Sequence, residues 1–508
     1  MDPTEVTRLM HARGICVVIP IYNNVGTAAS VVTAAKAYSQ DIIVVDDGST
    51  DGTTEALQQI DGITLVHYAR NRGKGYALKT GFRRALTMGF AYAVTMDGDG
   101  QHYAHDIATL LEANRKHPGA LIVGQRRLEG VERSRGSQFA NEFSNFWFWV
   151  QTGQRLEDTQ TGLRLYPLRH LHGLGLLTAR YEAELELLVF ASWHGVKLVA
   201  TPVDVYYPPR EERVSHFRPA ADFLRITVLN TVFCLLAIIY GLPLRLGRGL
   251  LRVVRTVYSL LFFIILTVFI ATPLTWFYAH VGPMTEHKRM RLHRFIYHSM
   301  RFIMIRHGIP GVRFTWHEAQ AQDTVDHEGE TQQVDEPRII ICNHESHLDL
   351  AAQLIFTPRV IFLTKDWVWH NPFYGFLIRH CEYYPVSTGL DDLLPQLRDV
   401  VSRGYSIAVY PECTRSEDCR IPRFHQGAFN LAQQLSLPIQ PMVLYGTGKV
   451  LPKHGRSLHK GHIHIETKSI ISRTELDAMG STMAQARELH HRYQQWYDDL
   501  ANNIEQEA

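Results

Sequence analysis

The chain is 508 residues long, which is enough for two or more domains. It carries 52 basic and 50 acidic residues, and a formal net charge of only +2 argues against a dedicated nucleic-acid binder. The six cysteines show no C-x-x-C spacing, so we expect a reducing compartment, no disulfide framework and no structural zinc. The opening residues MDPTEVTRLMHARG lack the apolar stretch of a signal peptide, which predicts no cleaved export signal.

Five short apolar runs lie between residues 15 and 123, and segments of helix length separate them. The runs are ICVVIP, DIIVVDD, ITLVHYA, AYAVTMD and ALIVG. This alternation predicts a mostly parallel sheet covered by helices. Ligands in such sheets bind at the carboxyl ends of the strands, where PIYNN, DDGSTDGT and DGDGQH follow the first, second and fourth runs.

Carboxylates gather at these strand ends. Asp97 and Asp99 flank a glycine, so both can face one cation, and such oxygen ligands suit Mg²⁺ or Mn²⁺ holding a diphosphate. A solvated turn is the alternative for an isolated D-x-D. Asp46 and Asp47 end a neighbouring strand, and Lys74 lies beside glycines at a predicted helix start, where backbone N–H groups favour phosphate.

Six blocks in order over residues 14–226 resemble family 2 glycosyltransferases, nearest the polyprenyl-phosphate (dolichyl-phosphate-mannose-synthase-like) branch. The blocks are VVIPIYNN, IIVVDDGSTDGT, NRGKGYALKTGF, MDGDGQH, DTQTGLRLY and SHFRPAADFLRI. The resemblance implies an α/β, Rossmann-like nucleotide-diphospho-sugar transferase fold and a nucleotide-sugar donor. It implies that Asp97, Asp99 and Gln101 hold the metal. It also implies donor binding by Pro20, Tyr22, Asp46, Asp47, Lys74 and Asp97. The chain departs from the family at Asn24, where the family has glutamate, and this alters a contact on the nucleotide side.

The acceptor decides which further residues the sugar transfer needs. A polyprenyl phosphate is already anionic and needs no general base, but cations must hold it. Arg126 and Arg133 are the candidates, with a solvated helix face as the alternative for Arg133. A neutral hydroxyl acceptor needs a base instead, and Asp158 is the candidate.

Two hydrophobic segments follow, at residues 226–244 and 256–279. As a helix the second would be roughly 36 Å long, enough to cross a bilayer, whereas the first would be roughly 28 Å and contains Asn230. Buried core helices are the alternative. Basic residues on every side do not fit a simple hairpin, whereas a re-entrant or interfacial arrangement would keep all of them near one anionic surface; spanning and re-entrant segments both stay open. They are Arg245, Arg248, Arg252 and Arg255, then Lys288, Arg289, Arg291 and Arg294. We expect attachment to a bacterial inner membrane with both catalytic domains cytoplasmic.

The rear part of the chain contains a histidine and an aspartate in NHESHLD. Residues 318–337 carry seven acidic residues and no lysine or arginine, which predicts a disordered surface loop. The strand RIIIC then leads to His344. On a regular helix His344 and Asp349 would not meet, but they can meet if His344 precedes a helix that begins near Ser346. Asp349 could then orient the imidazole while its other nitrogen takes a hydroxyl proton. Two unrelated surface polar residues are the alternative.

Further blocks over residues 256–450 resemble the glycerolipid (lysophosphatidate-type) acyltransferases. SIAVYPECTRSEDC is a strand that ends in the equivalent of their E-G-T-R block, and LTKDWVWHNPFYG and LPIQP resemble two others. The resemblance implies an α/β acyltransferase fold, catalysis by His344 and Asp349, and an acyl-CoA or acyl carrier protein as donor. It implies acceptor binding by Glu412, Thr414, Arg415 and Lys365. Cys413 stands where the family has glycine, which can alter the turn.

The expected organisation is therefore a fusion of two transferases, like fusions in aryl-polyene and flexirubin pathways. The expected parts are a glycosyltransferase domain at 1–225, membrane segments at 226–279, an acyltransferase domain at 280–475 and a C-terminal helix at 476–508. The fused enzyme would build an acylated glycolipid or lipid-anchored product. Two independent activities that share an attachment, a polyprenyl-phosphate sugar synthase and a lysophosphatidate acyltransferase, are the alternative. A lipid-binding scaffold with inactive sites is a third hypothesis. The presence of the motif residues, among them Asp97, Asp99, His344 and Asp349, disfavours it.

Overall fold

The computed structural model describes residues 1–127, 135–171, 173, 178–206, 219–307, 309–318, 336–372 and 374–507. It divides into two compact units, one of Met1–Arg248 with Asn502–Ala508 and the other of Gly249–Ala501. The boundary between the units lies within the basic stretch that separates the two hydrophobic segments.

A mixed seven-stranded sheet forms the centre of the first unit. Its strand order is β3-β2-β1-β4-β6-β5-β7, and the five predicted strands are β1 to β5. Their bounds are β1 (Ile15–Ile21), β2 (Ile42–Asp46), β3 (Thr64–His67), β4 (Tyr92–Thr95), β5 (Leu121–Arg126), β6 (Arg164–Pro167) and β7 (Leu198–Val203). β1 is parallel to β2 and β4, whereas β6 is antiparallel to β4 and β5. The carboxyl ends of β1, β2 and β4 therefore share one edge of the sheet, as expected.

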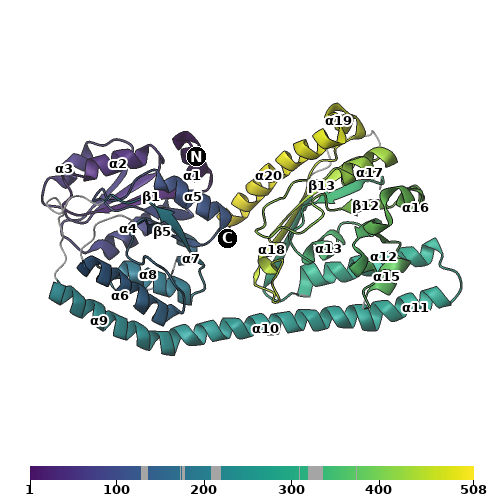
Figure 1. Cartoon of the computed structure of the whole chain (residues 1–508), viewed down its shortest axis with the longest axis horizontal. Helices are drawn as coiled ribbons and strands as arrows, with labels where there is room; N and C mark the ends of the chain where they lie inside the picture. The colour runs from purple at the N-terminus through teal and green to yellow at the C-terminus, as the bar shows by residue number, and fades with distance from the viewer. Residues whose placement is uncertain are drawn as a thin grey trace. The chain divides into compact units, whose positions relative to one another are not determined.

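Helices cover both faces of this sheet (Figure 1). They are α1 (Pro3–Ala12), α2 (Ala28–Lys36), α3 (Thr53–Gln58), α4 (Lys74–Thr87), α5 (Asp106–Lys116), α6 (Arg135–Thr152), α7 (Leu168–Leu171) and α8 (Glu182–Trp193). Alternate residues of β1 enter opposite cores, because successive side chains of a strand point to opposite faces. Val17 and Ile19 pack with α1, α2 and α5, and Cys16 and Val18 pack with α4 and α8.

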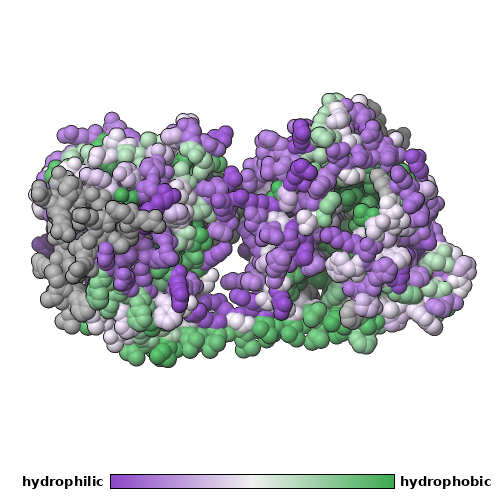
Figure 2. All heavy atoms as spheres, in the orientation of Figure 1, coloured by the Kyte–Doolittle hydropathy of each residue, from purple (hydrophilic) through white to green (hydrophobic). Residues whose placement is uncertain are grey.

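The two hydrophobic segments are joined in one continuous helix. Residues Ile226–His280 are long and apolar enough to cross a membrane by length and composition, and only 11% of the most apolar window is buried. Within it lie α9 (Pro219–Leu236), the π-helical turn η2 (Ala237–Gly241), α10 (Leu242–Ile264), η3 (Ile265–Ala271) and α11 (Thr272–His280). Hydrophobic side chains form a nearly unbroken surface along α9 and α10 (Figure 2).

A second seven-stranded sheet forms the centre of the second unit, in the order β11-β10-β12-β9-β13-β14-β8. Its strands are β8 (Val312–Glu318), β9 (Ile339–Cys342), β10 (Val360–Thr364), β11 (Tyr384–Pro385), β12 (Ser406–Val409), β13 (Ile439–Tyr445) and β14 (Gly461–Thr467). All neighbouring pairs are parallel except β13 and β14. The carboxyl ends of β9 and β12 therefore lie side by side, and these ends deliver the two rear motifs.

The helices of the second unit pack around this sheet. They are α12 (Glu286–Arg301), η4 (Phe302–His307), α13 (Leu348–Gln353), α14 (Asp366–Trp369), α15 (Gly375–His380), η5 (Val386–Thr388), α16 (Leu390–Ser402), α17 (Gly427–Leu435), α18 (Thr447–Val450), α19 (Arg473–Ala478) and α20 (Thr482–Glu507). In α20, Leu489, Tyr493 and Leu500 recur at helical spacing and are buried, so this face packs against the second unit's core. Most of the predicted acidic loop, residues 319–335, lies outside the described residues.

Two candidate active sites

Asp46, at the end of β2, organises the loop that follows it. Its carboxylate accepts hydrogen bonds from Ser49 N at 3.0 Å, Thr54 Oγ1 at 2.5 Å and His67 Nδ1 at 3.0 Å. Burial opposes ionisation, but the bonds from Ser49 and Thr54 outweigh it and lower the pKa of Asp46. Asp46 is therefore a charged carboxylate, and its hydrogen bonds hold the DDGSTDGT loop in place.

Asp47 fixes the start of α4. Its two oxygens accept from Arg72 N at 2.8 Å and Gly73 N at 2.7 Å, directly before Lys74. Gly73 has a φ of 100°, a conformation that favours glycine. Burial raises the pKa of the Asp47 carboxyl despite these two bonds. Its contribution to a bound nucleotide would come through the loop and helix that it positions.

Lys74 lies between two carboxylates. Its Nζ is 2.7 Å from Asp97 Oδ1 and 2.7 Å from Glu184 Oε2, which lies on α8. Burial opposes the positive charge, but Asp97 and Glu184 outweigh it and raise the pKa of Lys74. Glu184 was missed from the sequence, where the only signal was an acidic residue in the apolar stretch EAELELLVF.

Asp97 and Asp99 lie close enough to repel one another. Burial and the charge of Asp97 raise the pKa of Asp99 to about 6. Gly162 closes over Asp97, because a Cβ there would lie 2.1 Å from Asp97 Oδ2. Two like-charged carboxylates with the amide oxygen of Gln101 nearby in sequence make an oxygen donor set that fits Mg²⁺ or Mn²⁺.

A second acidic group lies on the same unit. His105, Asp106 and Asp204 have ligand atoms within 4.8 Å of one another. However, Arg127 Nη1 bonds Asp204 at 2.9 Å, and Asp106 Oδ2 accepts from Asp204 N at 2.9 Å. These bonds use oxygens of the group, as Lys74 and Gln101 N use one oxygen each of Asp97 and Asp99.

Asp158 and Arg126 form a bidentate ion pair. Arg126 Nε lies 2.6 Å from Asp158 Oδ2, and Nη2 lies 2.8 Å from Oδ1. Asp158 is 2% exposed. The predicted base and the predicted acceptor-binding arginine are therefore bonded to one another in this structure. Arg133, the other predicted acceptor ligand, lies outside the described residues.

The remaining predicted donor-binding residues lie at the end of β1. Pro20 is buried within the strand, whereas Tyr22 follows it and is 37% exposed. Asn24 turns inward, with Oδ1 accepting from Tyr22 N at 3.4 Å and its backbone N bonding Thr53 Oγ1 at 3.0 Å. Tyr22 is thus the exposed side chain of this group, and Asn24 supports it.

In the second unit, Asn343 extends the sheet beyond the end of β9. Its Nδ2 donates to Leu444 O at 2.7 Å and its Oδ1 accepts from Leu444 N at 2.8 Å, as a backbone residue of β9 would. This bonding to β13 fixes the position of the next residue, His344.

The structure brings His344 and Asp349 together in the way expected from the sequence. His344 precedes α13, and its Nδ1 lies 2.8 Å from Asp349 Oδ2. The same oxygen accepts from Glu345 N at 2.7 Å and Ser346 N at 2.8 Å, and Oδ1 accepts from Thr447 Oγ1 at 2.5 Å. Because a carboxylate only accepts, Nδ1 carries the proton and Nε2 keeps its lone pair for a hydroxyl.

The PECTRS turn after β12 is bonded to the backbone of His344. Glu412 Oε1 accepts from His344 N at 3.1 Å, and Ser416 N donates to His344 O at 2.7 Å. Burial, with smaller contributions from Asp349 and Glu345, raises the pKa of Glu412 to about 9. The imidazole also stacks on Tyr410, with ring centroids 4.0 Å apart. Glu412, expected to bind the acceptor, is 2% exposed and supports the histidine.

Thr414 and Arg415 line a cavity of about 400 Å³ together with Ser416, Arg420 and Lys453. Arg415 Nη1 donates to Lys453 O at 3.2 Å. Lys365 is exposed and precedes α14, outside this lining. Cys413 has a φ of 57°, so the turn keeps the left-handed conformation that glycine usually supplies. Glu417 and Asp418 also line the cavity and lie within 3.5 Å of Lys453 and Arg420, respectively, so Arg415 is the residue of this lining that we take as the candidate ligand of an anionic acceptor.

Comparison with known proteins assigns each unit to a family. The family described as glycosyl transferase family 2 matches residues 16–169, and the family described as acyltransferase matches residues 324–445. The chain therefore carries a glycosyltransferase domain followed by an acyltransferase domain, and its two activities are those of transferases.

Individual relatives cover one domain each. A UDP-N-acetylglucosamine–dolichyl-phosphate N-acetylglucosaminyltransferase of Methanococcus voltae is 27% identical, over 38% of this chain and 86% of its own length. A chloroplast 1-acyl-sn-glycerol-3-phosphate acyltransferase of Brassica napus is 32% identical, over 23% of this chain and 36% of its own length. The crystal structure of the Thermotoga maritima acyltransferase PlsC shares 17% identity at a TM-score of 0.40, covering 50% of this chain and 98% of that one. A structural likeness of that size adds nothing to the family assignment.

Proposed function

We propose that the chain is a bifunctional membrane-bound enzyme that glycosylates a lipid or polyprenyl-phosphate acceptor and acylates a hydroxyl of a glycolipid or lysophospholipid. The observation that carries the proposal is that one chain holds both a paired-carboxylate site with Lys74 and a His344–Asp349 dyad. The two reactions need these different tools, because one expels a diphosphate and the other deprotonates a hydroxyl.

In the front unit, Asp97, Asp99 and Gln101 would hold Mg²⁺ or Mn²⁺. The bound ion would neutralise the diphosphate that leaves the nucleotide sugar. Lys74, beside Asp97 and at the start of α4, adds a positive charge on the same side. A phosphate acceptor would compete with Asp158 for Arg126 and would need no base. A hydroxyl acceptor would need the Asp158 carboxylate, released from Arg126, as its base.

In the rear unit, His344 Nε2 takes the proton of the acceptor hydroxyl as that oxygen attacks the thioester carbonyl of acyl-CoA or acyl carrier protein. The thiolate of the carrier leaves as the ester forms, and the imidazolium returns the proton to it. Asp349 holds the imidazole in the reactive tautomer and stabilises its charge. Arg415 and Thr414 are placed to hold the acceptor's phosphate, if it has one.

The helix at 226–280 supports attachment along the surface of a membrane. Arg245, Arg248, Arg252 and Arg255 are spaced by three, four and three residues, so they share one face of α10. Arg245 and Arg248 donate to backbone carbonyls of Thr152 and Trp193 in the first unit.

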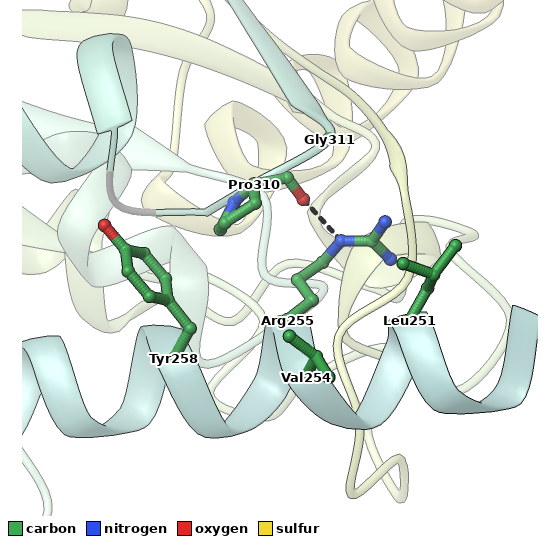
Figure 3. A pocket seen from close by; sticks show the side chains of 6 residues that line it. All are labelled: Leu251, Val254, Arg255, Tyr258, Pro310 and Gly311. Atoms are coloured by element: carbon green, nitrogen blue, oxygen red, sulfur yellow. Dashed lines mark hydrogen bonds between the residues drawn. The ribbon is translucent and has the colours of Figure 1, made fainter. Parts of the chain in front are cut away.

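Arg255 makes the corresponding bonds in the second unit. It donates to Pro310 O and, at 3.3 Å, to Leu458 O, beside an apolar cavity of about 240 Å³ (Figure 3). The opposite face of α10 is apolar, and Leu246, Leu250 and Val253 there are 55–65% exposed. Arginines bonded to protein in mid-helix disfavour a spanning arrangement, and an apolar stripe opposite them fits the plane of one leaflet. We place both catalytic domains on the cytoplasmic side of a bacterial inner membrane.

Flotation with phosphatidylglycerol and phosphatidylethanolamine vesicles tests this attachment. The double variant Leu246→Asp, Leu250→Asp should stay at the bottom of the gradient. The control Arg252→Gln, on the other face, should float, because one basic residue contributes only about 1 kcal/mol. Flotation of the double variant with the wild type would contradict attachment through this face.

The catalytic proposal is tested by reconstituting the purified chain with polyprenyl phosphate, a panel of nucleotide sugars and oleoyl-CoA, followed by lipid mass spectrometry. We expect both glycosylated and acylated products, and matching lipids in cells that express the gene but not in cells that lack it. Products of only one class, from a preparation competent for both donors, would contradict a bifunctional enzyme.

Two independent activities sharing one attachment remain the second candidate. The observation that favours it is that Thr414 and Arg415 line a cavity, because an arginine there suits a phosphate ester such as lysophosphatidate. A glycolipid made in the first reaction and then chased into an acylated form would support the sequential enzyme, and a chase without transfer would support the second candidate.

A further inference from the structure

The C-terminal helix α20 bonds to the residue next to the candidate base. Tyr497 donates its hydroxyl to Glu345 Oε1 at 2.6 Å, and Glu345, 2% exposed, directly follows His344. The Tyr497 ring also contacts Tyr445 at the end of β13, with centroids 5.5 Å apart. From the sequence this helix had only a packing role, so the contact was not expected.

The other carboxylate oxygen of Glu345 accepts a hydrogen bond from α18, the short helix that follows β13. Gly448 N donates to Glu345 Oε2 at 2.9 Å. Gly448 has no room for a side chain, because a Cβ would lie 2.6 Å from Cys419 Sγ and 3.1 Å from Glu345 Cβ. The Glu345 carboxylate is thus clamped from two sides, by Tyr497 of α20 and by Gly448 of α18.

Glu345 is connected to Asp349 through its backbone and through Thr447. Its N–H bonds the same Asp349 Oδ2 that holds His344 Nδ1. Thr447 Oγ1 lies 2.5 Å from Asp349 Oδ1 and 3.3 Å from Glu345 Oε2. Any displacement of the Glu345 side chain would therefore move a donor of the oxygen that orients the imidazole.

We propose that Tyr497 and Glu345 are positioning residues of acyl transfer, which clamp the turn at 344–346 and place a second carboxyl beside Asp349 to support the imidazolium formed in the reaction. This inference rests on the acyl transfer proposed above. Through it, the C-terminal helix becomes part of the acyltransferase site.

The surroundings of Glu345 make its charge adjustable. Burial, and then the charge of Asp349, raise its pKa to about 7, whereas the bonds from Tyr497 and Gly448 and the charge of Lys449 lower it. The titratable groups that face it are Asp349, Glu412, Cys342, Cys419, Lys449 and Tyr497. Near neutral pH the second carboxyl is therefore partly ionised, and its negative charge favours a protonated imidazole.

Tyr497→Phe tests the clamp, with Tyr493→Phe as the matched control. Tyr493 lies one turn earlier on α20, and its hydroxyl bonds only backbone atoms, Ile341 O at 2.8 Å and Met442 N at 3.0 Å. With oleoyl-CoA and 1-oleoylglycerol-3-phosphate, and CoA thiol release as readout, Tyr497→Phe should lower kcat about tenfold with KM changed less than about twofold. Tyr493→Phe should lower Tm but keep kcat. Equal losses of kcat in both variants at equal Tm would overturn the proposal, because the effect would then be structural.

Glu345→Gln tests the charge. The amide can donate to Tyr497 Oη and accept from Gly448 N, so the clamp is retained while the ionisation is removed. Because the pKa of Glu345 is about 7, its negative charge is present mainly above that pH, so Glu345→Gln should lose more kcat relative to the wild type at pH 8 than at pH 6. A loss that is equal at the two pH values would overturn the role of the second carboxyl.

Hydrogen exchange tests the clamp without any acceptor. The amides of Glu345 and Ser346 donate to Asp349, so in Tyr497→Phe the 343–349 peptide should exchange faster, and in Tyr493→Phe it should not. Unchanged exchange in Tyr497→Phe would overturn the clamp. His344→Ala in the same kinetic assay separates the two failures: if it keeps full activity, the proposed acyl transfer itself is wrong.

Discussion

The two central carboxylates of the molecule, Asp97 and Asp349, are held in different ways. Asp349 is fully buried and its oxygens accept from His344, Thr447 and two backbone N–H groups. Asp97 is paired with Lys74, which it shares with Glu184, and has Asp99 as a like-charged neighbour. The rear site is thus organised by the chain itself, whereas the front site contains a repulsion that a cation would relieve.

Because of this difference, the rear site is arranged for reaction before any substrate binds, whereas the front site needs an ion first. Fixed donors around Asp349 keep the imidazole oriented before any substrate binds, which lowers the cost of reaching the reactive geometry. Burial, and then the charge of Asp97, raise the pKa of Asp99 to about 6, so Asp99 resists ionisation beside Asp97 unless a cation is bound. Front activity should therefore depend on an added ion, and rear activity should not.

The largest expected effect is in the front unit. Asp97→Ala or Asp99→Ala should reduce nucleoside diphosphate release from the sugar donor to background, because the leaving group loses its counter-charge. Acyl transfer should be unchanged in both variants, and Asp61→Ala, an exposed aspartate of the same unit, should leave both reactions intact. Full sugar transfer by either motif variant would show that the ion binds elsewhere.

The next largest effect is in the rear unit. His344→Ala should slow acyl transfer about 10²–10⁴-fold, the usual contribution of a general base. Asp349→Asn should lower kcat with little change in KM, because the amide can favour the wrong tautomer. Exposed His287→Ala serves as the control. Wild-type rates for His344→Ala, with the lipid product verified by mass spectrometry, would refute the acyltransferase mechanism.

A smaller effect should separate the candidate acceptors. If the acceptor is a phosphate ester, Arg415→Ala should mainly raise its KM, and Arg415→Lys should recover only part of the loss because lysine cannot bind phosphate in a bidentate manner. Steady-state kinetics with lysophosphatidate and with an uncharged glycolipid measure this. An equal KM change for both acceptors would mean that Arg415 does not bind the phosphate group of the acceptor.

The smallest effect concerns stability. Cys413 adopts a φ of 57°, which costs a residue with a side chain roughly 1–2 kcal/mol. Cys413→Gly should therefore raise the free energy of unfolding of the second unit by about 1 kcal/mol, after the greater chain entropy of glycine is allowed for. Urea unfolding measures it, and Cys413→Ala, which keeps the strain, should bring no gain. A destabilised glycine variant would indicate that the thiol makes a needed contact.

The sequence predicted correctly those features that depend on short local patterns of residues. The five front strands and the meeting of His344 with Asp349 followed from short apolar runs and from the position of the histidine before a helix. Features that depend on tertiary contacts were missed. Glu184 reaches Lys74 from a helix more than a hundred residues away, and Tyr497 lies outside the apolar spacing of α20.

Two further features could not be derived from local patterns. Asp46 and Asp47 end a strand, as binding residues do, yet their oxygens bond the neighbouring loops, because the turn conformation decides which N–H groups come within reach. The charged stretch between the hydrophobic segments was expected to separate them. Its arginines instead share one face of α10, so the helix continues through it.

The most direct test of two differently organised sites is a chelator titration of one preparation with both reactions measured in parallel. Sugar transfer and acyl transfer would be followed by nucleoside diphosphate and CoA release as EDTA is added and Mg²⁺ or Mn²⁺ is then restored. We predict that sugar transfer falls to background and returns with the ion, while acyl transfer stays constant throughout. Loss of both activities, or survival of both, would contradict the account.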